Sequence, residues 1–137
     1  FAFNNIVVED IEFAEGSSLF ALFGQVDLTI NNLDISGLTV ESTIELECSI
    51  MKFNEGASDV EINTLTISDS EFRRGSLLFK VHEVNSFVMN DLTINDSTLK
   101  RNEEGIRAAF VVSDITTFEI NTFTLQDNTI DNYFIMQ

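Results

Sequence analysis

A motif of 13 residues occurs five times in this chain of 137 residues, and its copies align without gaps. The copies begin at Phe1, Leu28, Val60, Phe87 and Phe118, so that successive starts are separated by 27, 32, 27 and 31 residues. Self-similarity at such a period indicates a repeat architecture, in which each unit buries its apolar face only against its neighbours. The fold is therefore expected to be a stack of similar units.

Apolar side chains occupy motif positions 1, 3, 6, 8 and 13 in every copy. Alternation with a period of two predicts a β-strand, but the parity changes between positions 3 and 6, which requires an extra residue at a bend. Asn stands at position 4, where the parity changes, and Asn tolerates left-handed backbone and local turn bonds. Each motif is therefore predicted to be a strand, an Asn bend and a second strand. The residues of this column are Asn4, Asn31, Asn63, Asn90 and Asn121.

The second half of the repeat also has the pattern of a strand. Its aligned columns are Phe20, Phe79 and Phe110, and Leu22, Val81 and Val112. Three short strands and three bends make one turn of a three-sided coil, and coils stack at about 4.8 Å. Stacking would turn the Asn column into a ladder of side-chain amides and the Phe columns into aromatic stacks. We predict an all-β parallel β-helix (a solenoid) of about five stacked coils. Residues 1–137 would form one such segment, which we expect to belong to a larger chain.

A phrase of the form F-x-x-G-S-x-L-F recurs at residues 13–20 and 72–79. With the Asn ladder, it makes the whole chain resemble the pectin-lyase-like right-handed parallel β-helix superfamily, which implies a right-handed coil. The abundance of Asn, Ile, Phe and Thr is similar to that of large repetitive surface β-helix proteins of protists. Enzymes of this superfold usually cleave acidic polysaccharides, so the resemblance would imply clustered Asp with Arg, Lys or His on one sheet face.

A leucine-rich repeat is the alternative fold, because residues 62–72 fit its spacing of apolar positions. Its ladder Asn would fall at positions 11, 38, 70, 97 and 128, which here are Ile, Leu, Ser, Ser and Asn. The connecting halves also look like strands, and repeats of 31–32 residues exceed the usual length of about 20–29. These observations favour the β-helix.

The chain carries 7 Lys and Arg against 23 Asp and Glu, a net charge of −16. This balance argues against nucleic acid, which needs a basic surface, and against anionic lipid. No segment reaches the roughly 18 uncharged apolar residues of a membrane span. The expected partners are neighbouring β-helix coils, copies of the chain itself, and glycans. Cys48 is the only cysteine and is predicted to be a small buried apolar residue.

No catalytic constellation and no cofactor motif can be assembled from the sequence. The one His, His82, is predicted to point outward, and general acid–base chemistry needs a positioned partner that the sequence does not supply. Four of the seven cations, Arg73, Arg74, Lys100 and Arg101, are predicted to stack in one loop region. We interpret them as charge balance in an acidic protein rather than as a docking patch for an anionic glycan.

Motif position 10 is Asp in four copies, and Gly37 is the exception. Asp69, Asp96 and Asp127 come from consecutive coils, which places them about 5 Å apart. Carboxylates at this spacing could share Ca²⁺, which favours several oxygen ligands. The alternative is a solvated turn residue repeated by duplication.

Asn95 begins the only N-x-S/T sequon and would be a glycosylation site in a secreted protein. Repetition, acidity and the lack of a catalytic constellation predict an extracellular or cell-surface structural or adhesive scaffold. Such a scaffold could assemble by end-to-end stacking into a larger protein or filament. The alternatives are a polysaccharide-binding or polysaccharide-degrading β-helix module and a leucine-rich-repeat recognition module.

Overall fold

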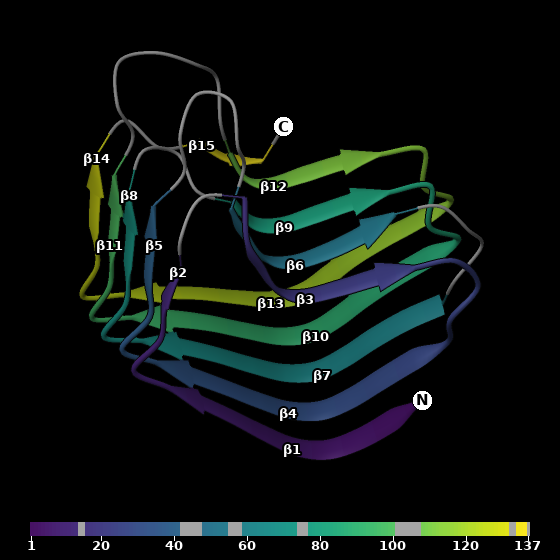
Figure 1. Ribbon diagram of the computed structural model, residues 1–137, viewed down its shortest axis with the longest axis horizontal. Helices are drawn as coiled ribbons and strands as arrows, with labels where there is room; N and C mark the ends of the chain where they lie inside the picture. The colour runs from purple at the N-terminus through teal and green to yellow at the C-terminus, as the bar shows by residue number, and fades with distance from the viewer. Residues whose placement is uncertain are drawn as a thin grey trace.

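The computed structural model describes residues 1–13, 16–41, 48–54, 59–73, 77–100, 108–131 and 134–136. All regular structure within these residues is β-strand. The strands form three sheets of five, and every strand pairing is parallel (Figure 1). The predicted all-β parallel solenoid is confirmed. The described parts of the connecting halves contain strands and no helix, so the leucine-rich-repeat alternative is wrong.

Every third strand along the chain joins the same sheet, so three strands complete one coil. The long-strand sheet contains β1 (Ala2–Glu9), β4 (Leu28–Ser36), β7 (Asp59–Ser68), β10 (Ser86–Asn95) and β13 (Thr117–Gln126). The short-strand sheet contains β2 (Glu12–Phe13), β5 (Thr39–Glu41), β8 (Glu71–Arg73), β11 (Thr98–Lys100) and β14 (Thr129–Asp131). The return sheet contains β3 (Ser18–Phe23), β6 (Ser49–Asn54), β9 (Leu77–His82), β12 (Ala108–Ser113) and β15 (Phe134–Met136). In Figure 1 the three sheets enclose a common interior.

The Asn bend lies inside a continuous long strand and does not separate two strands. Between β1 and β4, Phe3 pairs with Ile30 and Asn5 pairs with Asn32, while the intervening Asn is passed over by the backbone pairing. The same position is passed over at each of the other three steps of the sheet. One extra residue at this point reverses the parity of the inward positions, as the sequence pattern requires.

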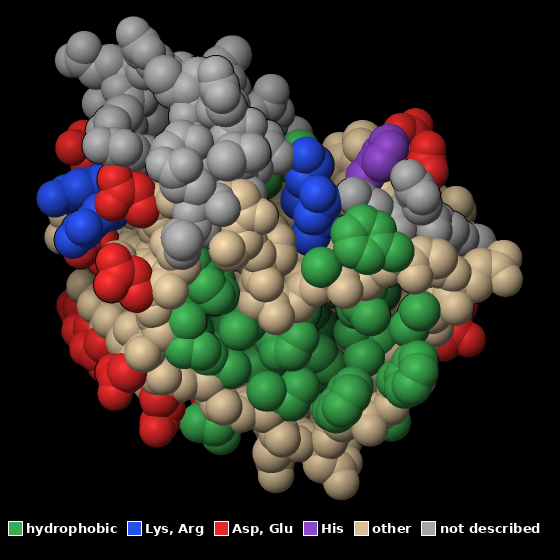
Figure 2. Space-filling view, viewed as in Figure 1, with side chains coloured by type: hydrophobic (Ala, Val, Ile, Leu, Met, Phe, Trp, Pro, Cys, Tyr) green, Lys and Arg blue, Asp and Glu red, His purple; other side chains and the backbone are tan. Residues whose placement is uncertain are grey.

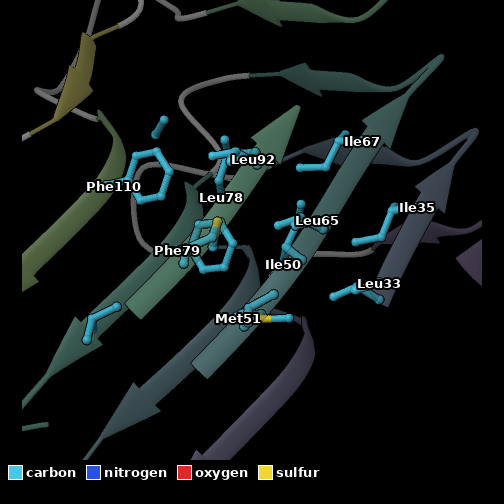
Figure 3. Close-up of a cluster of buried hydrophobic side chains, with 14 of the residues drawn as sticks. Leu33, Ile35, Ile50, Met51, Leu65, Ile67, Leu78, Phe79, Leu92 and Phe110 are labelled. Carbon is cyan, nitrogen blue, oxygen red and sulfur yellow. The ribbon is translucent and has the colours of Figure 1, made fainter. Parts of the chain in front are cut away.

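The core fills the interior between the long-strand and return sheets. Figure 3 shows Leu65 and its neighbours from the long strands facing Phe79 and Phe110 from the return strands. The rings of Phe79 and Phe110 stack at 5.1 Å with 5° between their planes, and the Phe87 ring meets Phe79 edge-on at 5.7 Å. Cys48 is fully buried in the same core, as predicted. The coils are therefore held together by apolar columns that run along the stack.

Candidate functional site

The five Asn of motif position 4 form one continuous ladder of side-chain amides on the outer side of the long-strand sheet. The Nδ2 group of each Asn donates to Oδ1 of the Asn in the preceding coil. The four distances are 3.0 Å for Asn31 to Asn4, 3.0 Å for Asn63 to Asn31, 2.6 Å for Asn90 to Asn63 and 2.8 Å for Asn121 to Asn90. The ladder links all five coils and has a direction, because every donor points towards the N-terminal coil.

The Asp column of motif position 10 forms the turn that follows each long strand. Its φ angles are 53° at Asp10, 49° at Asp69, 50° at Asp96 and 53° at Asp127, and Gly37 has a φ of 65°. Asp and Asn tolerate this left-handed conformation better than most residues, and Gly adopts it without strain. The backbone therefore explains both the repeated Asp and its one replacement by Gly.

No group of three or more His, Cys, Asp or Glu side chains is arranged to hold a metal ion within the described ranges. The carboxylates of the column bond locally: Asp96 Oδ2 accepts from Asn95 Nδ2 at 3.0 Å, and Asp127 Oδ2 accepts from Gln126 Nε2 at 3.1 Å. The hypothesis of a calcium ion shared by Asp69, Asp96 and Asp127 gains no support from this geometry.

Two substitutions at Asp69 separate a backbone role from a charge role. Asp69→Asn removes the charge but keeps a residue that tolerates positive φ, so the unfolding free energy should change little. Asp69→Val places a β-branched residue in the left-handed region and should cost about 1–2 kcal/mol. Urea unfolding of both variants measures the difference. Equal destabilisation by Asn and Val would contradict the backbone role.

A second ladder, buried and missed by the sequence analysis, runs along motif position 11. Ser97 Oγ accepts from the Ser70 backbone N–H at 3.1 Å and donates to the Asn95 carbonyl at 2.8 Å. Ser70 Oγ likewise accepts from the Leu38 N–H at 3.1 Å and donates to the Ser68 carbonyl at 2.7 Å. Each hydroxyl thus joins a backbone donor of the preceding coil to an acceptor of its own coil.

Asn128 continues this ladder in the last coil. Its Oδ1 accepts from the Ser97 N–H at 2.9 Å, and its Nδ2 donates to the Ile94 carbonyl at 2.7 Å. The available sequence signal was a polar residue at position 11 in three consecutive copies. In the sequence alone, this position serves only to argue against a leucine-rich repeat.

His82 lies at the end of β9 and points outward, with 38% of its side chain exposed. Its Nδ1 lies 2.7 Å from Ser113 Oγ and 3.4 Å from Asp114 Oδ2, and its Nε2 lies 3.5 Å from Glu83 Oε1. Ser113 and Asp114 share one ring nitrogen, and the acid on the other nitrogen lies beyond good hydrogen-bond range. We interpret the cluster as a polar link between neighbouring coils.

Arg73 is paired with acids on its own and the preceding coil. Its guanidinium lies 2.6 Å from Glu71 Oε2 and 3.9 Å from Glu41 Oε2. Lys100, the last residue of β11, stands in register with Asp131 of β14. Arg74 and Arg101, the other members of the predicted cationic group, lie outside the described residues. The two described members, Arg73 and Lys100, thus stand beside acidic residues, which agrees with their interpretation as charge balance.

The Arg73 hydrogen bond holds the pKa of Glu71 below its ordinary value of 4.5. A carboxyl whose pKa is lowered by folding stabilises the protein above its unfolded pKa, and this contribution is lost as the pH falls through the folded pKa. Glu71→Gln should therefore lower the melting temperature at pH 7 by no more than about 3 °C, since the pair is at the surface. The difference from the unsubstituted chain should vanish in acid below the folded pKa. A difference that persists there would contradict this cause.

Asn95 ends β10 and contacts Asp96 at the surface, whereas Ser97 of the same sequon is buried. Nothing in this arrangement tests glycosylation of Asn95, which stays a prediction.

Comparisons of the chain with profiles of protein families, with curated proteins and with solved structures give no match. The parallel β-helix therefore rests on the strand pairing itself. Among the described residues, no helix is long and apolar enough to cross a membrane.

Proposed function

We propose that this chain is an extracellular structural or adhesive scaffold whose coils associate end to end. The observation that carries the proposal is that both ends of the stack expose strand edges and apolar side chains. β1 and β13 are the outermost long strands, and an outermost strand presents unpaired backbone groups that can pair with another strand. Figure 2, which views the stack obliquely, shows hydrophobic side chains gathered on the face turned to the viewer.

The exposed apolar residues of the described chain belong to its first and last coils. Among the inward-facing columns, Phe3 is 46% exposed in the first coil, and Leu125 is 40% exposed and Ile130 43% exposed in the last. The corresponding residues of the middle coils are covered by a neighbouring coil on each side. A further coil stacked on either end would remove this apolar surface from water, which stabilises association.

The charged sides of the stack favour solubility over side-by-side association of two stacks. The net charge of −16 disfavours side-by-side packing of two such stacks at low ionic strength. The repeated polar columns bond to one another along the stack, so their hydrogen bonds are used within the scaffold. Association through the ends is therefore favoured over lateral clustering.

The extracellular setting is supported by the resemblance to the pectin-lyase-like superfamily and to large repetitive protist surface proteins. A glycan on Asn95 is expected in the natively produced protein. Intact-mass measurement before and after glycosidase treatment checks this expectation, and an unchanged mass equal to that of the bare chain would count against secretion through a glycosylating pathway.

Sedimentation velocity over a range of protein concentrations tests end-to-end association. We expect the average sedimentation coefficient to rise with concentration. Val7→Glu places a charge in the exposed first coil and should suppress the rise. The matched control is Thr66→Glu, because Val7, Asp34 and Thr66 stand in one outward column and Thr66 lies in a middle coil. A monomer at every concentration, or equal effects of the two variants, would overturn the proposal.

A further inference from the structure

We infer that Asn95 is a glycosylation site that folding closes: its glycan is attached before the fourth coil packs between its neighbours, and the folded chain accepts none. This inference rests on the glycan expected in the proposed function and adds when that glycan can be attached. The sequon consists of Asn95, Asp96 and Ser97, and it spans the turn between β10 and β11 of the fourth coil.

The hydroxyl of Ser97 is buried and already bonded. Ser97 is 2% exposed, and its Oγ accepts from the Ser70 N–H at 3.1 Å and donates to the Asn95 carbonyl at 2.8 Å. The glycosylation motif demands Ser or Thr at its third position, so the transferring enzyme must contact this hydroxyl. In the folded chain the enzyme cannot reach the hydroxyl, whose one proton is already donated.

The backbone of the sequon is also held in place. Asp96 has a φ of 50°, and its N–H donates to the Gln126 carbonyl at 3.1 Å. The Ser97 N–H donates to Asn128 Oδ1 at 2.9 Å. Both acceptors belong to the fifth coil. An enzyme that draws the sequon into its active site would therefore have to separate the fourth coil from the fifth at this corner.

Asn95 itself is well placed to carry a glycan once one is attached. It lies in an outward column between Ser68 and Gln126 and is only half-buried. In the transfer, Nδ2 bonds to the anomeric carbon of a lipid-linked sugar diphosphate, the bond from that carbon to the diphosphate oxygen breaks, and Nδ2 loses one of its two protons. The remaining N–H can keep the 3.0 Å bond to Asp96 Oδ2. The folded coil therefore tolerates the product of a reaction that it does not permit.

The order in which the chain is synthesised limits the time for transfer. The third coil emerges first and offers the Ser70 N–H that binds the Ser97 hydroxyl when the fourth coil docks. Asn128, 31 residues after Ser97, then completes the closure. Domains fold from the N-terminal side during synthesis, so transfer to Asn95 competes with this docking.

Glycosylation of the purified chain by an oligosaccharyltransferase, with a lipid-linked oligosaccharide as donor, tests the inference. The folded chain is compared with Leu65→Asp, which puts a charge at a fully buried core position and should unfold the stack without touching the sequon. Circular dichroism checks that this variant is unfolded. Both chains carry the same flexible tail after Gln137, with one added Asn-x-Thr sequon that reports enzyme activity on each molecule.

Mass spectrometry of the peptides gives the rate at each sequon. We expect the tail to react equally in both chains, and Asn95 to react at least about tenfold more slowly in the folded chain, because the reaction must wait for local opening. Equal rates at Asn95 in the folded and unfolded chains would overturn the inference.

Ser68→Asn repeats the test in the third coil. The change creates a second sequon with Asp69 and Ser70, in which Asp69 has a φ of 49° and Ser70 is 3% exposed. The Ser70 hydroxyl accepts from the Leu38 N–H and donates to the carbonyl of residue 68, so the geometry of the natural sequon is reproduced. This sequon should also react only in the unfolded chain, and its ready modification in the folded chain would count against closure by the buried hydroxyl.

Asn128→Ala tests which contact closes the sequon. The change removes the side chain that accepts from the Ser97 N–H and donates to the Ile94 carbonyl. We expect Asn95 of the folded variant to react at least about fivefold faster than in the unsubstituted folded chain. Gln126→Ala is the matched control, because Gln126 stands beside Asn95 but its side chain bonds to Asp127. Equal rates for the two variants would overturn closure by Asn128.

The failures of the two proposals can be told apart. Equal modification of Asn95 in the folded and unfolded chains overturns the closure and leaves the glycan of the proposed function standing. No modification of Asn95 in either chain, while both tails react, overturns the closure and the glycan together. Neither result changes the end-to-end association, which sedimentation tests separately.

Discussion

Replacing Phe79 by alanine is expected to lower the free energy of unfolding by about 3–5 kcal/mol, because the side chain is fully buried and nothing else can fill its space. Phe79 stacks on Phe110 in the next coil and meets Phe87 edge-on. Its loss therefore weakens the interface between two coils as well as the interior of its own. A whole domain is stabilised by only about 5–15 kcal/mol, so the effect should be large in urea unfolding.

Phe23→Ala is the matched control for this measurement. Phe23 ends β3, in the same sheet as Phe79, but is largely exposed in the first coil. The change should cost less than about 1 kcal/mol, as surface substitutions usually do. Similar losses for the two variants would contradict a core of stacked aromatic columns between the sheets.

Replacing Ser97 by alanine is expected to cost about 1–3 kcal/mol, although it removes a single oxygen. The hydroxyl is buried and serves the Ser70 N–H of the preceding coil and the Asn95 carbonyl of its own. Both backbone groups would lose this partner inside the protein, where unsatisfied polar groups are costly. The loss should appear as a lower urea midpoint with an unchanged slope.

Ser68→Ala is the control for Ser97→Ala, since it makes the same chemical change in an outward column. Ser68 follows Ser36 in that column and lies only partly buried at the end of β7. We expect a change within about 0.5 kcal/mol. If Ser68→Ala and Ser97→Ala lowered the free energy of unfolding equally, the buried hydrogen bonds of Ser97 would not explain its contribution to stability.

The stacking of the repeats could be predicted because it depends on side-chain periodicity, which the sequence displays directly. In β10, Phe87, Met89, Leu92 and Ile94 are buried, and they occupy the four apolar motif positions of that strand. The Asn at the parity change predicted the bend for the same reason. The bend was expected to separate two strands, whereas the strand continues through it, because backbone pairing resumes at the next residue.

The second ladder could not be predicted from side-chain identities alone. Ser70 and Ser97 form hydrogen bonds with backbone groups of their own and the preceding coil. The sequence does not show which backbone groups lie near a given side chain. The conformational reason for the Asp column was hidden in a related way, since a positive φ is not visible in the residue type. The exception at Gly37 was the signal that favoured a conformational explanation, because Gly would be a poor substitute for a metal ligand but a good one for a left-handed turn.

Cryo-electron microscopy of the chain, at concentrations where sedimentation shows association, tests the central claim most directly. The account predicts rods one chain wide with strands perpendicular to the axis. Five coils per chain at about 4.8 Å per strand spacing give an axial repeat of about 24 Å. Discrete particles of single-chain size, or assemblies joined through the sides of the stack, would contradict a scaffold built by end-to-end stacking.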